Sequence, residues 1–498
     1  MKSVNIMNFA RSLEPRSEEV EKLLLETTRK QLLLVNELQV EATFLLQYDV
    51  YCNEDFVKMI KSLAGKNIEL GFWYEVVEPL TTACGLPYES KNGWKWDWHI
   101  KPGFSMSYSS EQRIMLIDEA MRKFHEVFGY YPKTIGSWLL DTKTVNYLAS
   151  NYDIDAMCFC RDQINTDAYT LVGGYFNQAY YPSKNNMFTP ANSDETQIDV
   201  PVFRLLGPDP IHNYDNEKYA SPKVGRGPFS MEVALPNTGG GNPRITDWYL
   251  RNYFENESLG FAYMQIGQEN SFNMFDIIEP LRYQIKKLME YSDVAIEKMC
   301  VTGQRFKEKY KSTPPTALCA LDNWDSVDAQ SIYYDSKHYT ANLFRHENKV
   351  FIRSLYLFDD GIADVYNNTI CDTYDAIYEN MPIVDTIYQK SDTDGGLGII
   401  LDTEATNLSV SKISDDQLKI FWNDKTVIFT EDRIFIEKCK LSFTPDMKNT
   451  VISVFDDKIL FEYKSNKYVL LIQNGACTEN EGTISISGDK ITLIPSKI

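Results

Sequence analysis

The sequence lacks a long apolar run, and this absence limits where the protein is expected to work. No window of the 498-residue chain approaches the length of about 20 apolar residues that a membrane-spanning helix needs. Residues Met1–Ser12 also lack the hydrophobic core of a secretory signal. We therefore expect a cytoplasmic protein with no membrane partner.

Cysteine and histidine are few and scattered. The nine cysteines form no C-x-x-C pair, and their odd number and irregular spacing favour reduced thiols over a disulfide framework. Of the five histidines, only His99, near Asp97, and His212, near Asp209 and Asp215, fall in loops predicted to reach the site. This is thin support for zinc. We expect no metal and no cofactor.

Motifs for nucleophilic catalysis and nucleotide binding are also missing. No G-x-S-x-G marks a serine nucleophile, and no G-x-G-x-x-G marks a dinucleotide site. The polar stretch Ser221–Pro243 contains Gly239-Gly240-Gly241, but no Lys-Ser/Thr follows as in a phosphate-binding loop. A loop of this length is more often functional, and a lid over the site is one interpretation.

Basic residues are in deficit, since 50 Lys and Arg face 70 Asp and Glu for a net charge of −20. Such a surface repels phosphate backbones, so no nucleic-acid partner is expected. Aromatic residues, by contrast, reach 13%. The flat faces and polar edges of Tyr and Trp match those of sugar rings, although composition alone favours a Tyr-rich core. A carbohydrate partner is therefore allowed, and the oligomeric state stays open.

Residues 1–312 alternate short apolar runs with amphipathic helical stretches, which is typical of βα units around a parallel sheet. The pattern predicts an α/β fold, a (β/α)7-type barrel. One predicted helix spans Glu111–Phe128, with a capping box of Ser109 and Gln112 and with Gly129 at its end. The predicted strands are Val4–Phe9, Ala42–Tyr48, Ile68–Tyr74, Thr134–Leu140, Ala156–Cys160, Ile198–Leu205 and Leu259–Ile266.

The chain changes character near Ser312–Pro315, where Thr313-Pro314-Pro315 interrupts the helical pattern. Beyond it, short alternating runs are separated by Asp-Asp, Asn-Asp and Glu-Asp pairs or glycines, which is typical of an antiparallel sandwich. We therefore predict a barrel at 1–312 and an all-β sandwich domain at 313–498. The runs are Val350–Leu357, Leu418–Trp422, Val427–Phe429, Arg433–Ile436, Ile459–Tyr463, Lys467–Ile472 and Thr483–Ile486.

Each of the seven predicted barrel strands is followed within a few residues by an acid. In a β/α barrel the loops after the strands gather at one end, where the chemistry takes place. Any single acid is more often structural, and Asp141 could simply cap the next helix. Together, however, the acids predict a pocket that separates the pKa values of a carboxylate pair, as glycoside hydrolysis requires. We predict Asp141 as nucleophile or base and Glu269 as general acid.

Further residues near the strand ends are predicted to bind substrate. Acids would bind hydroxyl groups, and arginines would hold carboxylates or grip an acidic sugar. Aromatic residues would stack on sugar rings, although a packed loop core explains them equally well. The predicted substrate-binding residues are Glu14, Arg16, Asp49, Trp73, Glu75, Trp98, His99, Arg161, Asp162, Tyr181, Arg204 and Asp209.

Several long segments of residues 1–310 resemble an uncharacterised bacterial family, known mostly from gut bacteria, that is grouped with glycoside hydrolases. They include NFARSLEPR (Asn8–Arg16), GSWLLDT (Gly136–Thr142) and IGQENSF (Ile266–Phe272). The resemblance implies a catalytic barrel with a companion C-terminal β domain. More distantly, the strand layout resembles the barrels of glycoside hydrolase families 57 and 38 and of polysaccharide deacetylases.

The likeness to family 57 implies carboxylates after strands 4 and 7, which are Asp141 and Glu269 here. That family uses Glu and then Asp, whereas this chain has the reverse order. Two rival functions stay open beside glycoside hydrolysis of an oligo- or polysaccharide. A metal-dependent deacetylase or lyase would use Asp49, Asp97 and His99, although the third strand lacks the histidine pair of deacetylases. A non-catalytic carbohydrate-binding protein would keep the pocket without turnover.

Overall fold

The computed structural model describes residues 1–15, 20–160, 162–166, 169–215, 229–272, 276–386, 398–444 and 450–498. Within them, the N-terminal part is built on a nearly closed barrel sheet in the order β10-β1-β2-β3-β4-β5-β9-β8. The first seven of these strands pair in parallel, and the short β8 (Ala179–Tyr180) runs antiparallel to β9. The parallel strands are β1 (Lys2–Ala10), β2 (Ala42–Leu46), β3 (Ile68–Trp73), β4 (Thr134–Gly136), β5 (Ala156–Cys160), β9 (Val202–Leu205) and β10 (Ala262–Ile266).

Each of the seven predicted strands overlaps one of these parallel strands. The strands are almost continuously buried, as expected for a sheet covered on both faces. The predicted strand Thr134–Leu140 is longer than the observed β4, which stops at Gly136. The fold is therefore mixed α/β, and its exact closure as a (β/α)7 barrel stays a prediction.

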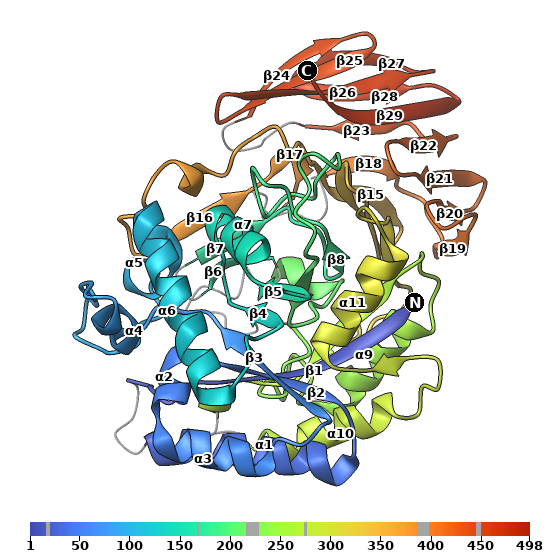
Figure 1. Ribbon diagram of the computed structural model, residues 1–498. Helices are drawn as coiled ribbons and strands as arrows, with labels where there is room; N and C mark the ends of the chain where they lie inside the picture. Colours follow the sequence, from blue (N-terminus) through green and yellow to red (C-terminus); the bar gives the residue numbers. More distant parts are fainter. Residues whose placement is uncertain are drawn as a thin grey trace.

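Helices surround the barrel sheet (Figure 1). The predicted capping box of Ser109 and Gln112 is confirmed at the start of α6, and Gly129 ends that helix in the left-handed region at φ 85°. None of the described helices combines the length and low polarity that crossing a bilayer requires. The helices are α1 (Val20–Leu38), α2 (Tyr48–Cys52), α3 (Glu54–Leu63), α4 (Glu78–Ala83), α5 (Ile100–Gly103), α6 (Ser110–Phe128), α7 (Thr142–Asn151), α9 (Pro243–Phe254), α10 (Ile278–Leu288) and α11 (Met299–Lys309).

Beyond β12 the chain forms antiparallel sheets, which lie away from α1 and α3 in Figure 1. One sheet contains β12 (Thr316–Ala320), β13 (Ala329–Asp335), β14 (Tyr339–His346), β15 (Lys349–Leu357), β17 (Met381–Asp385), β18 (Ile399–Asp402), β23 (Leu441–Phe443), β27 (Ala476–Asn480) and β28 (Thr483–Ser487). The other contains β19 (Ser409–Lys412), β20 (Leu418–Trp422), β21 (Lys425–Phe429), β22 (Ile434–Glu437), β24 (Thr450–Phe455), β25 (Lys458–Tyr463), β26 (Asn466–Gln473) and β29 (Lys490–Lys497). Side chains from both sheets share one apolar core.

The C-terminal part reaches back to the barrel. Strand β16 (Ala376–Glu379) pairs in parallel with β7 (Tyr169–Val172), which also pairs with β6 (Gln163–Thr166). The guanidinium of Arg353 donates to the carbonyl oxygens of Pro210 and Ile211, both at 2.9 Å. The element type changes between α11 and β12, where the boundary was predicted, but the division into domains at 312 and 313 stays a prediction.

The glycine run near residue 240 serves packing. A Cβ on Gly240 would lie 2.1 Å from the carbonyl oxygen of Met231, so no larger residue fits there. Gln284 donates to the carbonyl oxygens of both Met231 and Gly240. Residues 221–228 of the predicted lid lie outside the described residues, and the part that is described folds tightly on itself.

We predict that Asp335 makes the junction between the two parts sensitive to pH. Asp335 is buried and accepts the N–H of Phe176 at 3.0 Å, and burial raises its pKa to about 8. The folded state thus holds a proton that the unfolded state loses near pH 4. The free energy of unfolding should therefore fall as pH rises from about 4 to about 8. Denaturant titrations should show this slope reduced in Asp335→Asn; an identical slope would contradict the assignment.

Candidate functional site

Four neighbouring barrel strands, β10, β1, β2 and β3, end in polar residues that contact one another. Arg11 and Gln47 directly follow β1 and β2, while Glu75 and Glu269 follow β3 and β10 within three residues. An isolated parallel bridge between Phe9 and Glu269 continues the pairing of β1 with β10 up to this point. Because the strands are parallel, their carboxyl ends meet at one end of the barrel, where a β/α barrel holds its chemistry.

Arg11 lies between the two glutamates. Its Nη2 donates to Oε2 of Glu269 at 2.8 Å and lies 3.9 Å from Oε2 of Glu75. The exposed fractions of the side chains are 1% for Arg11 and Glu75 and 5% for Glu269. A buried charge is tolerated only when it is paired. One guanidinium therefore balances two carboxylates, and the trio would carry excess negative charge if both were ionised.

Amide and carboxylate side chains hold the backbone around Arg11. Its N–H donates to Oδ1 of Asn270 at 3.1 Å, and Nδ2 of Asn270 donates back to its carbonyl oxygen at 2.8 Å. Oδ2 of Asp49 accepts the N–H groups of Ser12 at 2.5 Å and Leu13 at 2.9 Å. Burial raises the pKa of Asp49, and the hydrogen bonds from Ser12 and Leu13 oppose that shift. Asp49 thus anchors the loop that positions Arg11.

Neutral donors surround Glu75. Its Oε2 accepts Nε2 of Gln47 at 2.9 Å and Nε1 of Trp96 at 3.1 Å. Its Oε1 is buried and has no hydrogen-bond partner among the described residues. Burial raises the pKa of Glu75, and the charge of Arg11 and the indoles of Trp73 and Trp96 only partly oppose the shift. Glu75 therefore keeps its proton to a higher pH than an exposed glutamate, as a general acid must.

Aromatic rings cover Arg11. The guanidinium carbon lies 3.9 Å from the ring centroid of Trp96 and 5.6 Å from that of Phe9. Phe9 in turn stacks on Trp73 at a centroid distance of 4.0 Å. These rings exclude water from the guanidinium and strengthen its interaction with the carboxylates.

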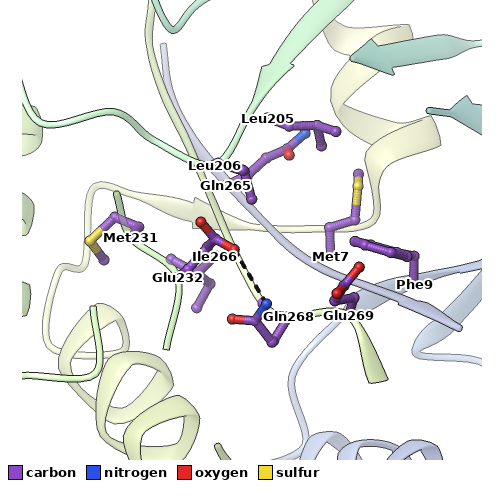
Figure 2. A pocket seen from close by; sticks show the side chains of 11 residues that line it. Met7, Phe9, Leu205, Leu206, Met231, Glu232, Gln265, Ile266, Gln268 and Glu269 are labelled. Carbon is purple, nitrogen blue, oxygen red and sulfur yellow. Dashed lines mark hydrogen bonds between the residues drawn. The ribbon is translucent and has the colours of Figure 1, made fainter. Parts of the chain in front are cut away.

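A small pocket of about 20 Å³ adjoins Glu269 (Figure 2). Its walls are mostly apolar, with Met7 and Phe9 near Glu269, and it also contains Glu232 and Gln268. Nε2 of Gln268 donates to Oε1 of Glu232 at 3.4 Å. A space of this size holds about one water molecule. The pocket therefore brings a second acid, from the chain after β9, close to Glu269.

Asp141, the predicted nucleophile or base, caps a helix and forms an ion pair in the structure. Asp141 is fully buried at the N-cap of α7, where Oδ1 accepts the N–H of Thr144 at 3.0 Å. The same oxygen accepts Nη1 of Arg113 at 2.8 Å, and Oδ2 accepts the hydroxyls of Ser105 at 2.5 Å and Thr144 at 2.7 Å. Asp141 has its own arginine, whereas Glu269 shares Arg11 with a second buried carboxylate, Glu75. Helix capping, the structural alternative for this residue, is what the structure shows.

Four predicted substrate-binding residues have structural partners instead. Nη2 of Arg204 pairs with Asp162 at 2.7 Å, and its other nitrogens donate to backbone carbonyls. Buried Asp209 accepts Nε1 of Trp324 at 2.7 Å, and burial raises its pKa. Buried Tyr181 follows β8, beside the start of β9, and donates its hydroxyl to a backbone carbonyl at 2.8 Å. Tyr181 therefore lies at the opposite end of the barrel strands from Glu269.

The other predicted residues are divided between the site and its surroundings. Trp73 is fully buried beneath Phe9, so it supports the site rather than offering a stacking face. Trp98 is half-buried and packs against Trp96 at a centroid distance of 5.9 Å. Nδ1 of half-buried His99 lies 2.6 Å from Oδ1 of Asp97, and Glu14 is partly exposed. Arg16 and Arg161 lie outside the described residues.

Sequence reasoning missed the residue that joins the site. Arg11 directly follows β1, but the residues predicted after this strand are Glu14 and Arg16. Trp96 is not among the predicted residues, and Glu232 lies far from any predicted strand end. Reading the first polar residue after every strand, whatever its charge, would have found Arg11 and Gln47.

The residues proposed for a metal do not fit one. Oδ2 of Asp49 accepts backbone N–H groups of the Arg11 loop, while Asp97 binds His99 and the hydroxyl of Ser90. Within the described ranges, no group of three or more His, Cys, Asp or Glu side chains is arranged to hold a metal ion. We therefore derive no step through a metal.

These features define a mixed α/β barrel protein with a buried carboxylate–guanidinium site. Residues 91–317 match the profile of a domain of unknown function, DUF3863, for which solved structures exist. No curated protein sequence matches the chain. Among solved structures, the chain is similar to a candidate glycoside hydrolase/deacetylase from Parabacteroides distasonis, with 14% identity and a TM-score of 0.53. The match covers 76% of this chain and 89% of that one.

Two other similar structures are candidate polysaccharide deacetylases. The one from Mycobacterium smegmatis is 12% identical, with a TM-score of 0.38, and the match covers 62% of this chain and 90% of that one. The one from Pseudomonas aeruginosa is 10% identical, with the same TM-score, and the match covers 62% and 91%. At such identities the comparisons concern the fold, and only the Parabacteroides protein is similar enough to support it.

We predict that Arg11→Met strongly destabilises the protein, because it leaves two buried carboxylates without their cation. The free energy of unfolding should fall by about 3–5 kcal/mol. Adding Glu269→Gln should recover part of this loss, since it removes one of the unpaired charges. Denaturant unfolding measures both effects. Arg122→Met, whose side chain is 58% exposed on α6, is the control and should leave the free energy of unfolding almost unchanged. Equal losses for both arginines would contradict the site.

Proposed function

We propose that the protein is a glycoside hydrolase acting on an oligo- or polysaccharide, with Glu75 and Glu269 as its carboxylate pair. The observation that carries this proposal is the buried trio in which Arg11 contacts both glutamates through one nitrogen. Glu75 replaces Asp141 in the pair that the sequence predicted. We take the parallel strands as a (β/α)7-type barrel and residues 313–498 as a companion sandwich domain.

The two glutamates are suited to different roles. Glu75 has a raised pKa because it is buried, so it fits the general acid that protonates the leaving oxygen. Glu269 pairs closely with Arg11 and accepts the hydroxyl of Ser271, so it fits the carboxylate that attacks the anomeric carbon or activates water. Separate environments for two carboxylates are what acid–base chemistry near neutral pH requires.

The spacing of the pair favours net retention of configuration. Oε2 of Glu269 and Oε2 of Glu75 lie 2.8 and 3.9 Å from the same nitrogen of Arg11. Their separation cannot exceed the sum of these distances. That limit admits the spacing of about 5 Å in retaining enzymes and excludes all but the shortest spacings in the roughly 6.5–9.5 Å range of inverting enzymes.

A sugar substrate is supported by the surroundings of the pair. Trp94, Trp96 and Trp98 pack together, with centroids 4.9 Å apart for Trp94–Trp98. Trp94 and Trp98 are partly exposed and offer ring faces for stacking. Arg11 and the two glutamates are almost fully buried, and Trp96 covers Arg11, so we propose that substrate binding moves the segment that carries Trp96 away from Arg11. The similar Parabacteroides protein is described as a candidate glycoside hydrolase/deacetylase.

We predict that Glu75→Gln and Glu269→Gln each lower kcat by about 10²–10⁴-fold on a cleavable glycoside found by screening. Substrate binding should be largely kept, because the amide preserves the shape of each side chain. Glu54→Gln, an exposed residue in the first turn of α3, is the control and should keep full activity. Wild-type kcat in either active-site variant would exclude that residue from catalysis.

The two roles can be separated chemically. An aryl glycoside with a good leaving group needs little acid assistance, so it should restore turnover to Glu75→Gln selectively. Azide, a small nucleophile, should restore turnover to Glu269→Ala by forming a glycosyl azide. If the aryl glycoside restored turnover to the Glu269 variant and azide restored turnover to the Glu75 variant, Glu269 would be the general acid and Glu75 the nucleophile. Release of acetate from an acetylated sugar, with no cleavage of glycosidic bonds, would favour the deacetylase alternative, and binding without any product would favour a non-catalytic protein.

A further inference from the structure

A second concave site lies on the outside of the barrel, between α6 and α7. This groove has a volume of about 590 Å³ and is completed by residues 184–185 and 363–368. Helices α6 and α7 lie side by side in Figure 1 and are in contact. The volume falls within the range of about 300–1,000 Å³ that is usual for ligand sites. Unlike the pocket at Glu269, the groove is already open to a sugar-sized ligand.

The groove is positively charged in a protein of net charge −20. Its described lining includes Lys143, Lys184 and Arg113 but no Asp or Glu. Nζ of Lys143 donates to the hydroxyl of Ser110 at 2.7 Å, and Nζ of Lys184 donates to a backbone carbonyl at 2.8 Å. Within the described part of the chain, neither lysine forms an ion pair. Both ammonium groups are therefore available to an anion.

Two exposed acids beside the groove, Glu111 and Glu195, interact electrostatically with these lysines but do not line it. The third cation, Arg113, is already paired with buried Asp141 at 2.8 Å. The binding charge of the groove therefore comes from Lys143 on α7 and from Lys184 in the chain after β8.

The remaining lining is rich in amide and hydroxyl groups. Amide N–H groups of Asn146, Asn151 and Asn367 donate to backbone carbonyls at 2.6 to 2.9 Å, which fixes their orientation. Oδ1 of Asn367 is buried and has no hydrogen-bond partner in the described structure. The side chain of Asn367 is partly exposed, so a small displacement would let this oxygen accept a ligand hydroxyl and remove the free-energy cost of leaving it unpaired. The partly exposed ring of Tyr147 adds an apolar face.

We propose that this groove binds an acidic polysaccharide, as a site separate from the carboxylate pair. The two lysines would bind carboxylate groups of the sugar chain, the asparagine oxygens would accept from its hydroxyls, and Tyr147 would support a ring face. The lining offers amide and hydroxyl groups that both donate and accept, together with one ring face, and this combination matches the hydroxyl groups and apolar ring faces of a sugar chain. We therefore choose a saccharide over an acidic peptide, which the experiment below tests with polyglutamate.

The test is calorimetric binding of a short oligogalacturonate to the full chain, with a neutral maltooligosaccharide of equal length as the reference. Lys143→Gln/Lys184→Gln should weaken oligogalacturonate binding by about tenfold or more, since two charge-assisted contacts are lost. Lys58→Gln/Lys440→Gln removes the same charge at exposed positions outside the groove and should leave binding unchanged. Wild-type binding should also weaken as ionic strength rises from about 0.01 M to about 1 M.

Three results would overturn the proposal: equal affinity for the acidic and neutral sugars, unchanged binding in Lys143→Gln/Lys184→Gln, or equal losses in both lysine pairs. Polyglutamate is the peptide reference. If it binds as tightly as oligogalacturonate, and if Lys143→Gln/Lys184→Gln abolishes its binding too, the groove is a general anion site and the saccharide proposal is rejected. The outcome is independent of the proposed hydrolase, because Glu269→Gln should bind oligogalacturonate at the groove as tightly as the wild type does.

Discussion

The site depends on one buried interaction, the guanidinium of Arg11 between Glu269 and Glu75. Two carboxylates at the ends of neighbouring strands would repel each other in a water-poor environment without a cation between them. The protein holds that cation firmly, since Asn270 bonds both backbone groups of Arg11 and Asp49 holds the residues that follow. These hydrogen bonds fix the backbone of Arg11 at the position where its side chain contacts both carboxylates.

Arginine–carboxylate pairs at the other strand ends have a structural role. After β4 and β5, Asp141 pairs with Arg113 and Asp162 with Arg204, and these pairs join loops and helices. The barrel mouth is thus divided into two halves. One half carries unequal charges and polar atoms without partners, while the other carries one-to-one ion pairs that bind the C-terminal part. Excess charge and unmet hydrogen bonds, rather than acids as such, mark the candidate site.

This division explains what the sequence could predict. The strands and the two ends of α6 depend on residues that are close together in the sequence. Apolar runs form the strands, and Ser109, Gln112 and Gly129 cap the helix beside them. The positions of these strands and caps were therefore predicted well. The pairing of an acid depends on residues far away in the chain. Asp141 and Glu269 both follow apolar strands, yet the arginines at positions 113 and 11 give them different environments. Without coordinates, a capping acid and an acid of the carboxylate–guanidinium site have the same sequence pattern.

The most direct test of this account is a crystal structure of Glu269→Gln with a bound oligosaccharide. The account predicts that one glycosidic bond lies between residues 75 and 269, with its oxygen within hydrogen-bond distance of Glu75 and with Trp96 displaced from Arg11. A sugar chain bound in the barrel mouth beyond the reach of both residues, with Trp96 still packed on Arg11, would contradict it.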